Sequence, residues 1–286
     1  IVLQPDPGTM LVFISFVFVM YREGLSGNIL LIGLLAIIIA VIGIFLKASE
    51  TSFDLLGSSI SGNMFFGFIL LVISVLSFFI IKFFVLPRYR KEKFYRLAIV
   101  TVIGIVISLG VNHVYDNLFK DRHRNRFQIM FGIKEDRTGD GYNIYQALSA
   151  IGSGETTGKG YLKGTLSNDK YKHVPEQSTD FIFCTVGEEW GFLGSLFFLG
   201  IFGGLLIRII YLAEKQKSQF CRVYGYSVAC ILFVHLLINL GMTIGLAPTI
   251  GIPLPFMSYG GSSLLSFTIL LFIFLNLNSY RMNILR

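Results

Sequence analysis

The residues in this chain that could do chemistry are a few carboxylates set beside long apolar runs. Asp180 stands in Val174-Pro-Glu-Gln-Ser-Thr-Asp-Phe, where a polar stretch ends and an apolar segment begins. A carboxylate at an apolar boundary loses water, and this loss raises its pKa toward the range of a useful general base. Asp180, or Thr179 beside it, could instead cap the N-terminus of the next helix. Position alone leaves both interpretations open.

Two further carboxylates, Glu188 and Glu189, lie deeper in the same apolar segment, within Gly187-Glu-Glu-Trp-Gly. At 3.6 residues per turn, Glu188 falls on the same half of a helix as Asp180, whereas Glu189 points to the opposite side. Carboxylates inside an apolar span are costly, so they line a wet cavity or find a cation. We therefore expect at least one of the two to be functional.

A glycine-dense stretch precedes these carboxylates, with Gly139-Asp-Gly-Tyr-Asn followed by Ala150-Ile-Gly-Ser-Gly-Glu-Thr-Thr-Gly-Lys-Gly. Glycines let backbone N–H groups approach a phosphate closely, and Lys159 could supply positive charge. The pattern is not a Walker loop, because no strand leads in and the Gly-Lys-Ser/Thr ending is absent. On spacing alone, plain turns in a long loop are the favoured interpretation.

Two later features are less specific. His235 and Asn239 are spaced i, i+4, which favours an interhelical hydrogen bond over a ligand site. The segment Pro248–Ser263 is uncharged and rich in proline and glycine. Irregular backbone near a membrane must be buried in protein or face water, so we expect this segment to form a cavity wall.

The composition predicts which elements hold these residues. Of 286 residues, 53% are hydrophobic and only 14% are charged, and the mean hydropathy is +0.69. Ile29–Leu46 and Met64–Ile81 carry no charge, and about twenty residues cross a hydrocarbon core of roughly 30 Å. The chain is therefore predicted to be an all-α polytopic membrane protein. Its net charge of +7 lies mostly in connections and one long loop, which argues against a nucleic-acid partner.

Seven apolar segments are predicted to be transmembrane helices. The first is short, and its helix is expected to begin near Pro7, where a missing N–H costs nothing. In chain order the segments are Met10–Tyr21, Ile29–Leu46, Met64–Leu86, Leu97–Val111, Phe181–Ile207, Val223–Gly245 and Leu264–Leu277.

The distribution of Lys and Arg predicts the orientation. Lys82–Arg96 and Arg208–Arg222 are basic connections and are assigned to the cytoplasm, as is the C-terminus, whereas Ala48–Asn63 has no Lys or Arg. The polar loop 112–180 then lies outside the membrane. Structureless loops of this length are rare unless they are functional, so the chemistry is expected there.

Several of these motifs together resemble the SEDS family (shape, elongation, division and sporulation). Gly158-Lys-Gly-Tyr-Leu-Lys-Gly-Thr-Leu-Ser is more similar to the elongation branch, RodA, than to the division branch, FtsW. The chain is expected to lack the family's N-terminal helices. The motifs are Gly251-Ile-Pro-Leu-Pro-Phe-Met-Ser-Tyr-Gly-Gly-Ser-Ser within Pro248–Ser263, Asn239-Leu-Gly-Met, Gln146-Ala-Leu-Ser-Ala-Ile-Gly-Ser-Gly, Pro175-Glu-Gln-Ser-Thr-Asp-Phe, Gly187-Glu-Glu-Trp-Gly and Gln4-Pro-Asp-Pro-Gly-Thr.

The resemblance implies one SEDS-type membrane domain over residues 1–286, in the bacterial cytoplasmic membrane. It implies a peptidoglycan glycosyltransferase that polymerises lipid II by inverting transfer with Asp180 as general base, and a class B penicillin-binding protein as transpeptidase partner. A divalent cation, Mg²⁺ or Mn²⁺, is left open as a cofactor. The implied substrate-binding residues are Gln4, Asp6, Lys159, Lys163, Glu176, Thr179, Glu188, Glu189, Ser258, Tyr259, Gly260, Gly261 and Ser262.

Three other functions stay open beside this one. A lipid II flippase would use the carboxylates to line a path, a non-catalytic scaffold would only position the penicillin-binding protein, and an FtsW-type protein would act in division. The chain also departs from the family pattern. Ser178 stands where the family usually has His, and four spans instead of two separate the Gln4 motif from the long loop. One extra pair of spans is therefore expected within residues 10–111.

Overall fold

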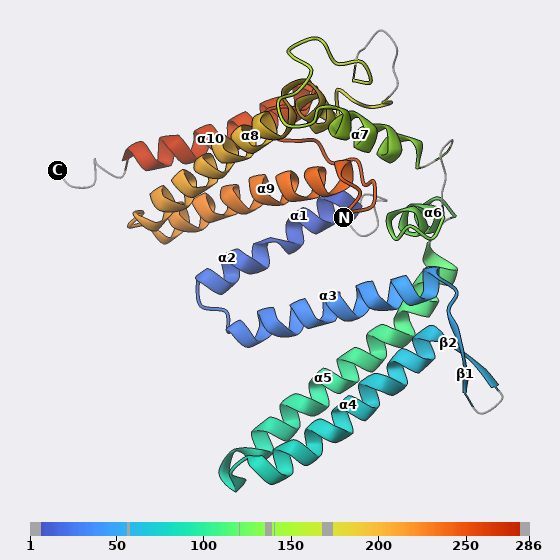
Figure 1. The fold of residues 1–286 in the computed structure, drawn as a ribbon. Helices are drawn as coiled ribbons and strands as arrows, with labels where there is room; N and C mark the ends of the chain where they lie inside the picture. The colour runs from blue at the N-terminus through green and yellow to red at the C-terminus, as the bar shows by residue number, and fades with distance from the viewer. Residues whose placement is uncertain are drawn as a thin grey trace. The chain divides into compact units, whose positions relative to one another are not determined.

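The computed structural model describes residues 7–55, 58–119, 121–134, 139, 141–167 and 174–280, which are mostly helical (Figure 1). The chain forms two compact units. Unit 1 comprises Ile1–Leu25 and Asp136–Arg286, and unit 2 comprises Ser26–Glu135. The single domain expected over residues 1–286 stays a prediction.

Unit 2 is built on three long apolar helices, α3 (Gly27–Ala48), α4 (Gly62–Phe84) and α5 (Pro87–His113). α5 packs against both α3 and α4. Strands β1 (Ser52–Leu55) and β2 (Ser58–Ser61) form an antiparallel hairpin between α3 and α4. The π-helix η1 (Val114–Leu118) continues α5, and α6 (Asp121–Met130) follows it.

Polar side chains join these apolar helices at a few points. Asn63 Nδ2 donates to Asn112 Oδ1 at 2.8 Å, and Ser108 Oγ donates to the carbonyl of Asn63 at 3.1 Å. The hydroxyls of Ser74 and Thr101 share a hydrogen bond of 2.7 Å between α4 and α5. Such bonds between apolar helices contribute about 0.6 kcal/mol each on average in a membrane.

Unit 1 is organised around α9 (Gln219–Thr243), which packs against α8 (Ile182–Glu214) and α10 (Gly261–Tyr280). The short helices α1 (Pro7–Ile14), α2 (Phe16–Arg22) and α7 (Tyr142–Ser153) also contact α9. The core between these helices is apolar, with Leu232 and Phe274 fully buried. The polar segments of unit 1 connect the helices that form this core.

Charged side chains fasten α2 to α9 and α8 at one end of unit 1. Arg222 makes two hydrogen bonds of 2.8 Å to the carboxylate of Glu23, in the bidentate geometry that suits a guanidinium. Arg22 pairs with Glu214, which also accepts from the hydroxyl of Tyr226. The Arg222 pair holds the pKa of the Glu23 carboxyl below its usual range.

The predicted spans are largely confirmed. Six helices of the described chain, α3, α4, α5, α8, α9 and α10, are long and apolar enough to cross a membrane. The predicted span Met10–Tyr21 is instead two short helices, which begin at Pro7 as expected. They meet at Ser15, whose hydroxyl donates to the carbonyl of Val12 at 2.6 Å. The exposed apolar faces of the long helices are those of a multi-pass membrane protein.

Two sequence expectations need correction. The segment 112–180 is not a structureless loop, because it holds η1, α6 and α7 in addition to the end of α5. α5 also begins at Pro87, ten residues before the predicted start at Leu97. Proline at the first helical position is compatible with a helix start, and the basic residues after it continue the helix beyond the apolar run.

We predict that Gly225→Ala destabilises unit 1. A Cβ at Gly225 would lie 2.4 Å from Phe274 and 2.7 Å from Ala213, where α9 meets α10 and α8. Overpacking of this kind costs about 1–3 kcal/mol, which would appear as a lower midpoint of thermal unfolding in detergent. The matched control is Gly203→Ala in α8, which meets nothing within 4 Å. Equal midpoints for the two variants would contradict the tight crossing.

Candidate functional site

Asp180 lies in a turn just before α8. Glu176 adopts a left-handed backbone with φ of 53°, and its carbonyl accepts from the N–H groups of Thr179 at 3.2 Å and Asp180 at 3.0 Å. α8 begins only at Ile182, and no side chain caps it. The alternative interpretation, in which Thr179 or Asp180 caps this helix, is therefore wrong. The Thr179 hydroxyl donates instead to the carbonyl and the carboxylate of Glu176, both at 3.1 Å.

The predicted placement of Asp180 and Glu188 on one half of the same helix is wrong. Asp180 precedes α8, so helical periodicity does not place it on one half of that helix with Glu188. Its direction is set by the turn at Glu176 instead.

The Asp180 carboxylate is half-buried, and within the described part of the chain no hydrogen bond or ion pair reaches it. Burial raises the pKa of this carboxyl, and the negative charge of Glu176 raises it further. Gly251 lies close by, since a Cβ there would come within 3.2 Å of Asp180 Oδ2. A carboxylate without a partner and with a raised pKa is suited to accept a proton.

Hydrogen bonds from three residues fasten the Asp180 turn to α9 and to the segment Pro248–Ser263. Asn239 Nδ2 donates to the carbonyls of Asp180 and Ile252, both at 2.8 Å. The buried Ser258 hydroxyl donates to the carbonyl of Thr179, and it accepts from a backbone N–H at 2.7 Å. The N–H of Tyr259 donates to the carbonyl of Ser178 at 2.7 Å. These contacts therefore position the backbone that carries Asp180.

The bonds of Asn239 and His235 differ from the expected interhelical pair. Asn239 binds two irregular segments of backbone instead of another helix. The ring of His235 lies 2.8 Å from the carbonyl of Ile231 in its own helix and meets Phe267 of α10 edge-on. His235 therefore contributes to helix packing, whereas Asn239 positions backbone.

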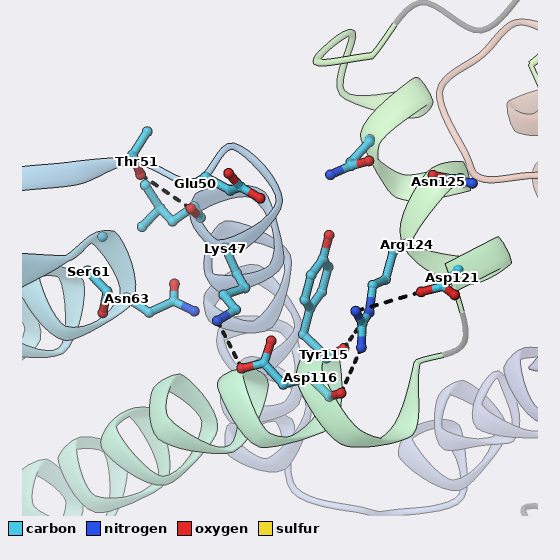
Figure 2. A pocket seen from close by; sticks show the side chains of 13 residues that line it. Lys47, Glu50, Thr51, Ser61, Asn63, Tyr115, Asp116, Asp121, Arg124 and Asn125 are labelled. Atoms are coloured by element: carbon cyan, nitrogen blue, oxygen red, sulfur yellow. Dashed lines mark hydrogen bonds and ion pairs between the residues drawn. The ribbon is translucent and has the colours of Figure 1, made fainter.

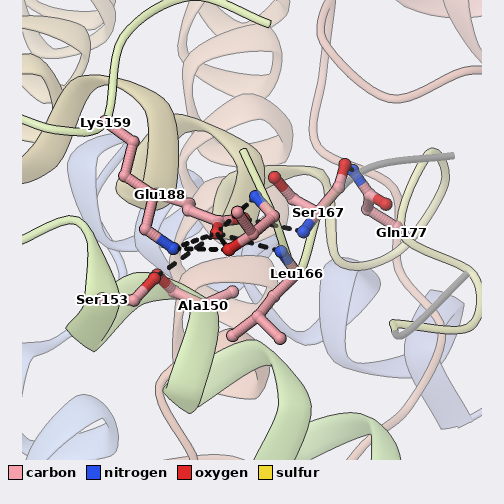
Figure 3. A network of polar contacts seen from close by, with 8 residues as sticks. Ala150, Ser153, Lys159, Leu166, Ser167, Gln177 and Glu188 are labelled. Carbon is pink, nitrogen blue, oxygen red and sulfur yellow. Dashed lines mark hydrogen bonds and ion pairs between the residues drawn. The ribbon is translucent and has the colours of Figure 1, made fainter. Parts of the chain in front are cut away.

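Glu188 is fully buried and is the centre of a polar network (Figure 3). Lys159 Nζ donates to Glu188 Oε1 at 2.6 Å and to the hydroxyl of Thr165 at 2.7 Å. The backbone N–H groups of Thr165 and Leu166 donate to Oε1 at 2.8 and 3.0 Å, and that of Ser167 donates to Oε2 at 2.7 Å. These donors replace the water that the carboxylate loses on burial.

The glycine-dense stretch wraps closely around a kink in α8. Gly191 interrupts the helix with φ of 63° and ψ of −160°. The N–H groups of Lys159 and Gly160 donate to the carbonyls of Glu188 and Glu189 at 3.0 and 2.9 Å. At Gly158, φ is +79° and a Cβ would lie 2.2 Å from the carbonyl of Glu189, so only glycine fits. Residues 154–160 form turns against the helix, as the favoured interpretation expected, whereas residues 150–153 of the same stretch belong to α7.

The predicted substrate residues are thus distributed over several environments. Lys159 and Glu188 pair with each other, whereas the side chain of Lys163 is exposed. Glu189 is 8% exposed and Tyr259 is 79% exposed. Gln4 and Asp6 lie outside the described residues. Substrate binding stays a prediction for all of these residues. It also stays a prediction for Glu176 and Thr179 beside Asp180, for Ser258, and for Gly260, Gly261 and Ser262 at or just before the start of α10.

The fit of a divalent cation can be tested on the side chains that would bind it. Within the described residues, no three side chains of His, Cys, Asp or Glu gather at one point. The described residues therefore bring at most two such side chains together at any one point.

Unit 2 contains a polar pocket that the sequence does not indicate (Figure 2). Its volume is about 480 Å³, and residues from three separate segments line it. Lys47 pairs with Asp116 at 2.9 Å, and Arg124 donates to the carbonyls of Tyr115 and Asp116 at 2.9 and 2.7 Å. These bonds hold η1 between α3 and α6. No sequence pattern reveals the pocket, because the three segments are far apart in the chain.

Comparisons with known proteins give one family. The model of a family described as cell cycle protein, FtsW/RodA/SpoVE, matches residues 71–283. The peptidoglycan glycosyltransferase MrdB of Escherichia coli K12 is 36% identical over 167 residues, which are 58% of this chain and 45% of that protein. The peptidoglycan glycosyltransferase RodA of Treponema pallidum is 35% identical over 171 residues, which are 59% of this chain and 39% of that protein.

The chain therefore matches less than half the length of these curated relatives. Among solved structures, it is similar to a chain of "Structural coordination of polymerization and crosslinking by a peptidoglycan synthase complex", with a TM-score of 0.47. That chain is 22% identical, and the similarity covers 96% of this chain and 89% of that chain.

We predict that Glu188→Ala strongly destabilises unit 1. The substitution leaves Lys159 and three backbone N–H groups without their acceptor, and breaking a buried ion pair costs about 3–5 kcal/mol. The control is Glu92→Ala, which breaks the exposed pair with Arg96 and should change the unfolding midpoint little. The Lys159→Ala and double variants complete a cycle, and additive losses would contradict the coupling.

We predict that Asp180→Asn does not lower stability at pH 7. A carboxyl whose folded pKa is raised contributes stability that is full below its unfolded pKa and is lost as pH rises through its folded pKa. The Asn side chain is nearly the same size but does not ionise, so the variant does not lose this stability as pH rises. Thermal unfolding at pH 7 and at about pH 4 should show the variant at least as stable as the wild type at pH 7, with a smaller difference at pH 4. A lower midpoint at pH 7 would mean that the carboxylate has a structural partner.

Proposed function

Because this chain belongs to the FtsW/RodA/SpoVE family of cell cycle proteins, we propose that it is a peptidoglycan glycosyltransferase that polymerises lipid II. The single observation that carries the proposal is the Asp180 carboxylate, which is half-buried and has a raised pKa at the boundary of an apolar helix. Its relatives named as peptidoglycan glycosyltransferases support the same reaction class.

In the proposed reaction Asp180 acts as the general base. It takes the proton from the attacking sugar hydroxyl of one lipid-linked saccharide. The oxygen then forms a bond to the anomeric carbon of the other saccharide, on the face opposite the diphosphate. The bond from that carbon to the diphosphate oxygen breaks, and the lipid diphosphate leaves with the electron pair. The transfer therefore inverts the anomeric configuration.

One carboxylate suffices for this chemistry. A glycosidase needs a second carboxyl group to protonate a poor leaving group, but diphosphate leaves as an anion. The departing charge calls for a nearby cation instead. Lys159 is occupied by Glu188, so the exposed Lys163 is the better candidate of the two loop lysines. Lys163 follows Tyr161 and Leu162, which are 69% and 72% exposed and suit contact with a lipid.

Glu188 and Glu189, in the first turns of α8, have different roles in the proposed reaction. Glu188 positions the loop through its bonds to Lys159 and to the backbone of residues 165–167. Glu189 accepts a hydrogen bond from this loop through its carbonyl, and its buried side chain is assigned to substrate binding only by the family resemblance. The expectation that at least one of these two glutamates is functional is met in the proposal by Glu188, which positions the loop.

The proposal also covers the partner protein, the cellular role and the orientation in the membrane. The partner is a class B penicillin-binding protein that crosslinks the polymer, and the role is elongation, as in the RodA branch. The orientation has the basic connections and the C-terminus in the cytoplasm and the segment 112–180 outside. The two alternative functions, a flippase and a scaffold, can be distinguished from the proposed enzyme because neither makes glycan polymer from lipid II.

We predict that Asp180→Asn strongly lowers the rate of polymerisation in a folded protein. Loss of a general base typically lowers the rate by about 10²- to 10⁴-fold. The measurement is the length distribution of glycan formed from purified lipid II, with and without the penicillin-binding protein. The matched control is Glu155→Gln, which neutralises an exposed carboxylate of the same segment and should leave the polymer unchanged.

Two outcomes would count against this proposal. Equal polymer from wild type and Asp180→Asn would keep the enzyme and reject Asp180 as its base. No polymer from the wild type, even with the partner present, would reject the enzyme in favour of a transporter or scaffold. Movement of labelled lipid II between leaflets would then single out the transporter.

A further inference from the structure

Positive charge is concentrated at the bend between α4 and α5 of unit 2, which we call the basic corner (residues 82–96, Figure 1). Six basic residues and one acidic residue, Glu92, give these fifteen positions a net charge of +5, out of +7 for the whole chain. Glu92 is the only acidic residue between positions 55 and 115. The six basic residues are Lys82, Arg88, Arg90, Lys91, Lys93 and Arg96.

The structure uses little of this charge internally. Arg96 pairs with Glu92 at 2.5 Å, so the one carboxylate is already occupied. Arg90 Nε donates to the carbonyl of Val85 at 2.8 Å, which closes the bend. Lys91 and Lys93 are exposed, and no hydrogen bond or ion pair reaches their amines within the described residues. The surplus positive charge therefore faces outward.

Aromatic side chains are interleaved with the lysines and arginines. Phe83 and Phe84 are 73% and 85% exposed, and Tyr89 and Tyr95 are 50% and 70% exposed. Phe94 packs inward and stacks on Phe78 with ring centroids 4.7 Å apart, which fixes the first turns of α5 against α4. Exposed aromatic rings beside Lys and Arg are typical of the boundary between hydrocarbon and lipid headgroups.

The length of α5 places these charges beyond the hydrocarbon. Its 27 residues span about 40 Å, whereas a hydrocarbon core is about 30 Å thick. The charged residues all fall in its first ten positions, from Pro87 to Arg96. When the apolar part of the helix lies in the bilayer, the first turns pass through the headgroup layer.

We propose that the basic corner is a binding surface for anionic phospholipid headgroups. Arginine and lysine donate to phosphate oxygens, and the exposed phenylalanines and tyrosines enter the adjacent acyl region. An acidic protein would match the charge but would leave those aromatic rings without an apolar environment. Anionic lipid satisfies both, so it is the occupant that the surface fits. The proposal is independent of the glycosyltransferase reaction, and it holds for either leaflet.

The test uses the full protein in nanodiscs that contain a photoactivatable phosphatidylglycerol in a phosphatidylcholine background. After illumination, mass spectrometry compares crosslinks to residues 82–96 with crosslinks to the basic connection 208–222. The variant is Lys91→Gln/Lys93→Gln, and the control is Arg208→Gln/Lys217→Gln, which lowers the net charge by the same amount. All four side chains are exposed, and equal unfolding midpoints would verify that both variants fold.

The expected result is that crosslinks concentrate at the basic corner and fall in the corner variant but not in the control. The loss is up to about fivefold for each lysine, and it shrinks as salt rises from about 0.01 M to about 0.15 M. Three results would overturn the proposal. These are equal labelling by a photoactivatable phosphatidylcholine, equal losses in both variants, and no loss in the corner variant.

Discussion

The position of the polar segment of unit 1 depends on one buried carboxylate. Glu188 lies inside a helix long enough to span a membrane, and an unpaired charge there would be costly. Lys159 and the backbone N–H groups of residues 165–167 supply the compensation. They can do so only if residues 153–167 fold back onto α8. The need to satisfy one charge thereby fixes a long polar segment against an apolar helix.

The same requirement separates the carboxylates by function. Glu188 accepts hydrogen bonds on both carboxylate oxygens, so its side chain is already engaged within the fold. Asp180 lies only eight residues earlier, yet its carboxylate has no partner in the described structure, and burial raises its pKa. Asn239 and Ser258 bind the backbone around Asp180 and leave its side chain unengaged. The protein thus holds the turn firmly through carbonyl groups while keeping the carboxylate available.

Sequence reasoning succeeds where one physical rule dominates and fails where tertiary contacts decide. Unbroken apolar runs indicate the six long helices of the described chain, because length and hydrophobicity are enough to identify a membrane-spanning helix. The boundary position of Asp180 marks it as a candidate base or cap, and the structure excludes the cap because α8 begins only at Ile182, after the turn at Glu176. The pairing of Lys159 with Glu188 crosses 29 residues and lies beside a kink at Gly191, which no local pattern encodes. The pocket of unit 2 escapes sequence reasoning for the same reason.

The most direct test of this account is the pH dependence of glycan polymerisation by the wild-type protein. If Asp180 is the base, the rate falls on the acid side with a midpoint above the 3.8 of an ordinary aspartate, because its carboxylate must be ionised to accept a proton. The residual rate of Asp180→Asn then has no such limb. An acid limb that survives unchanged in Asp180→Asn would assign the titrating base to another group and contradict the account.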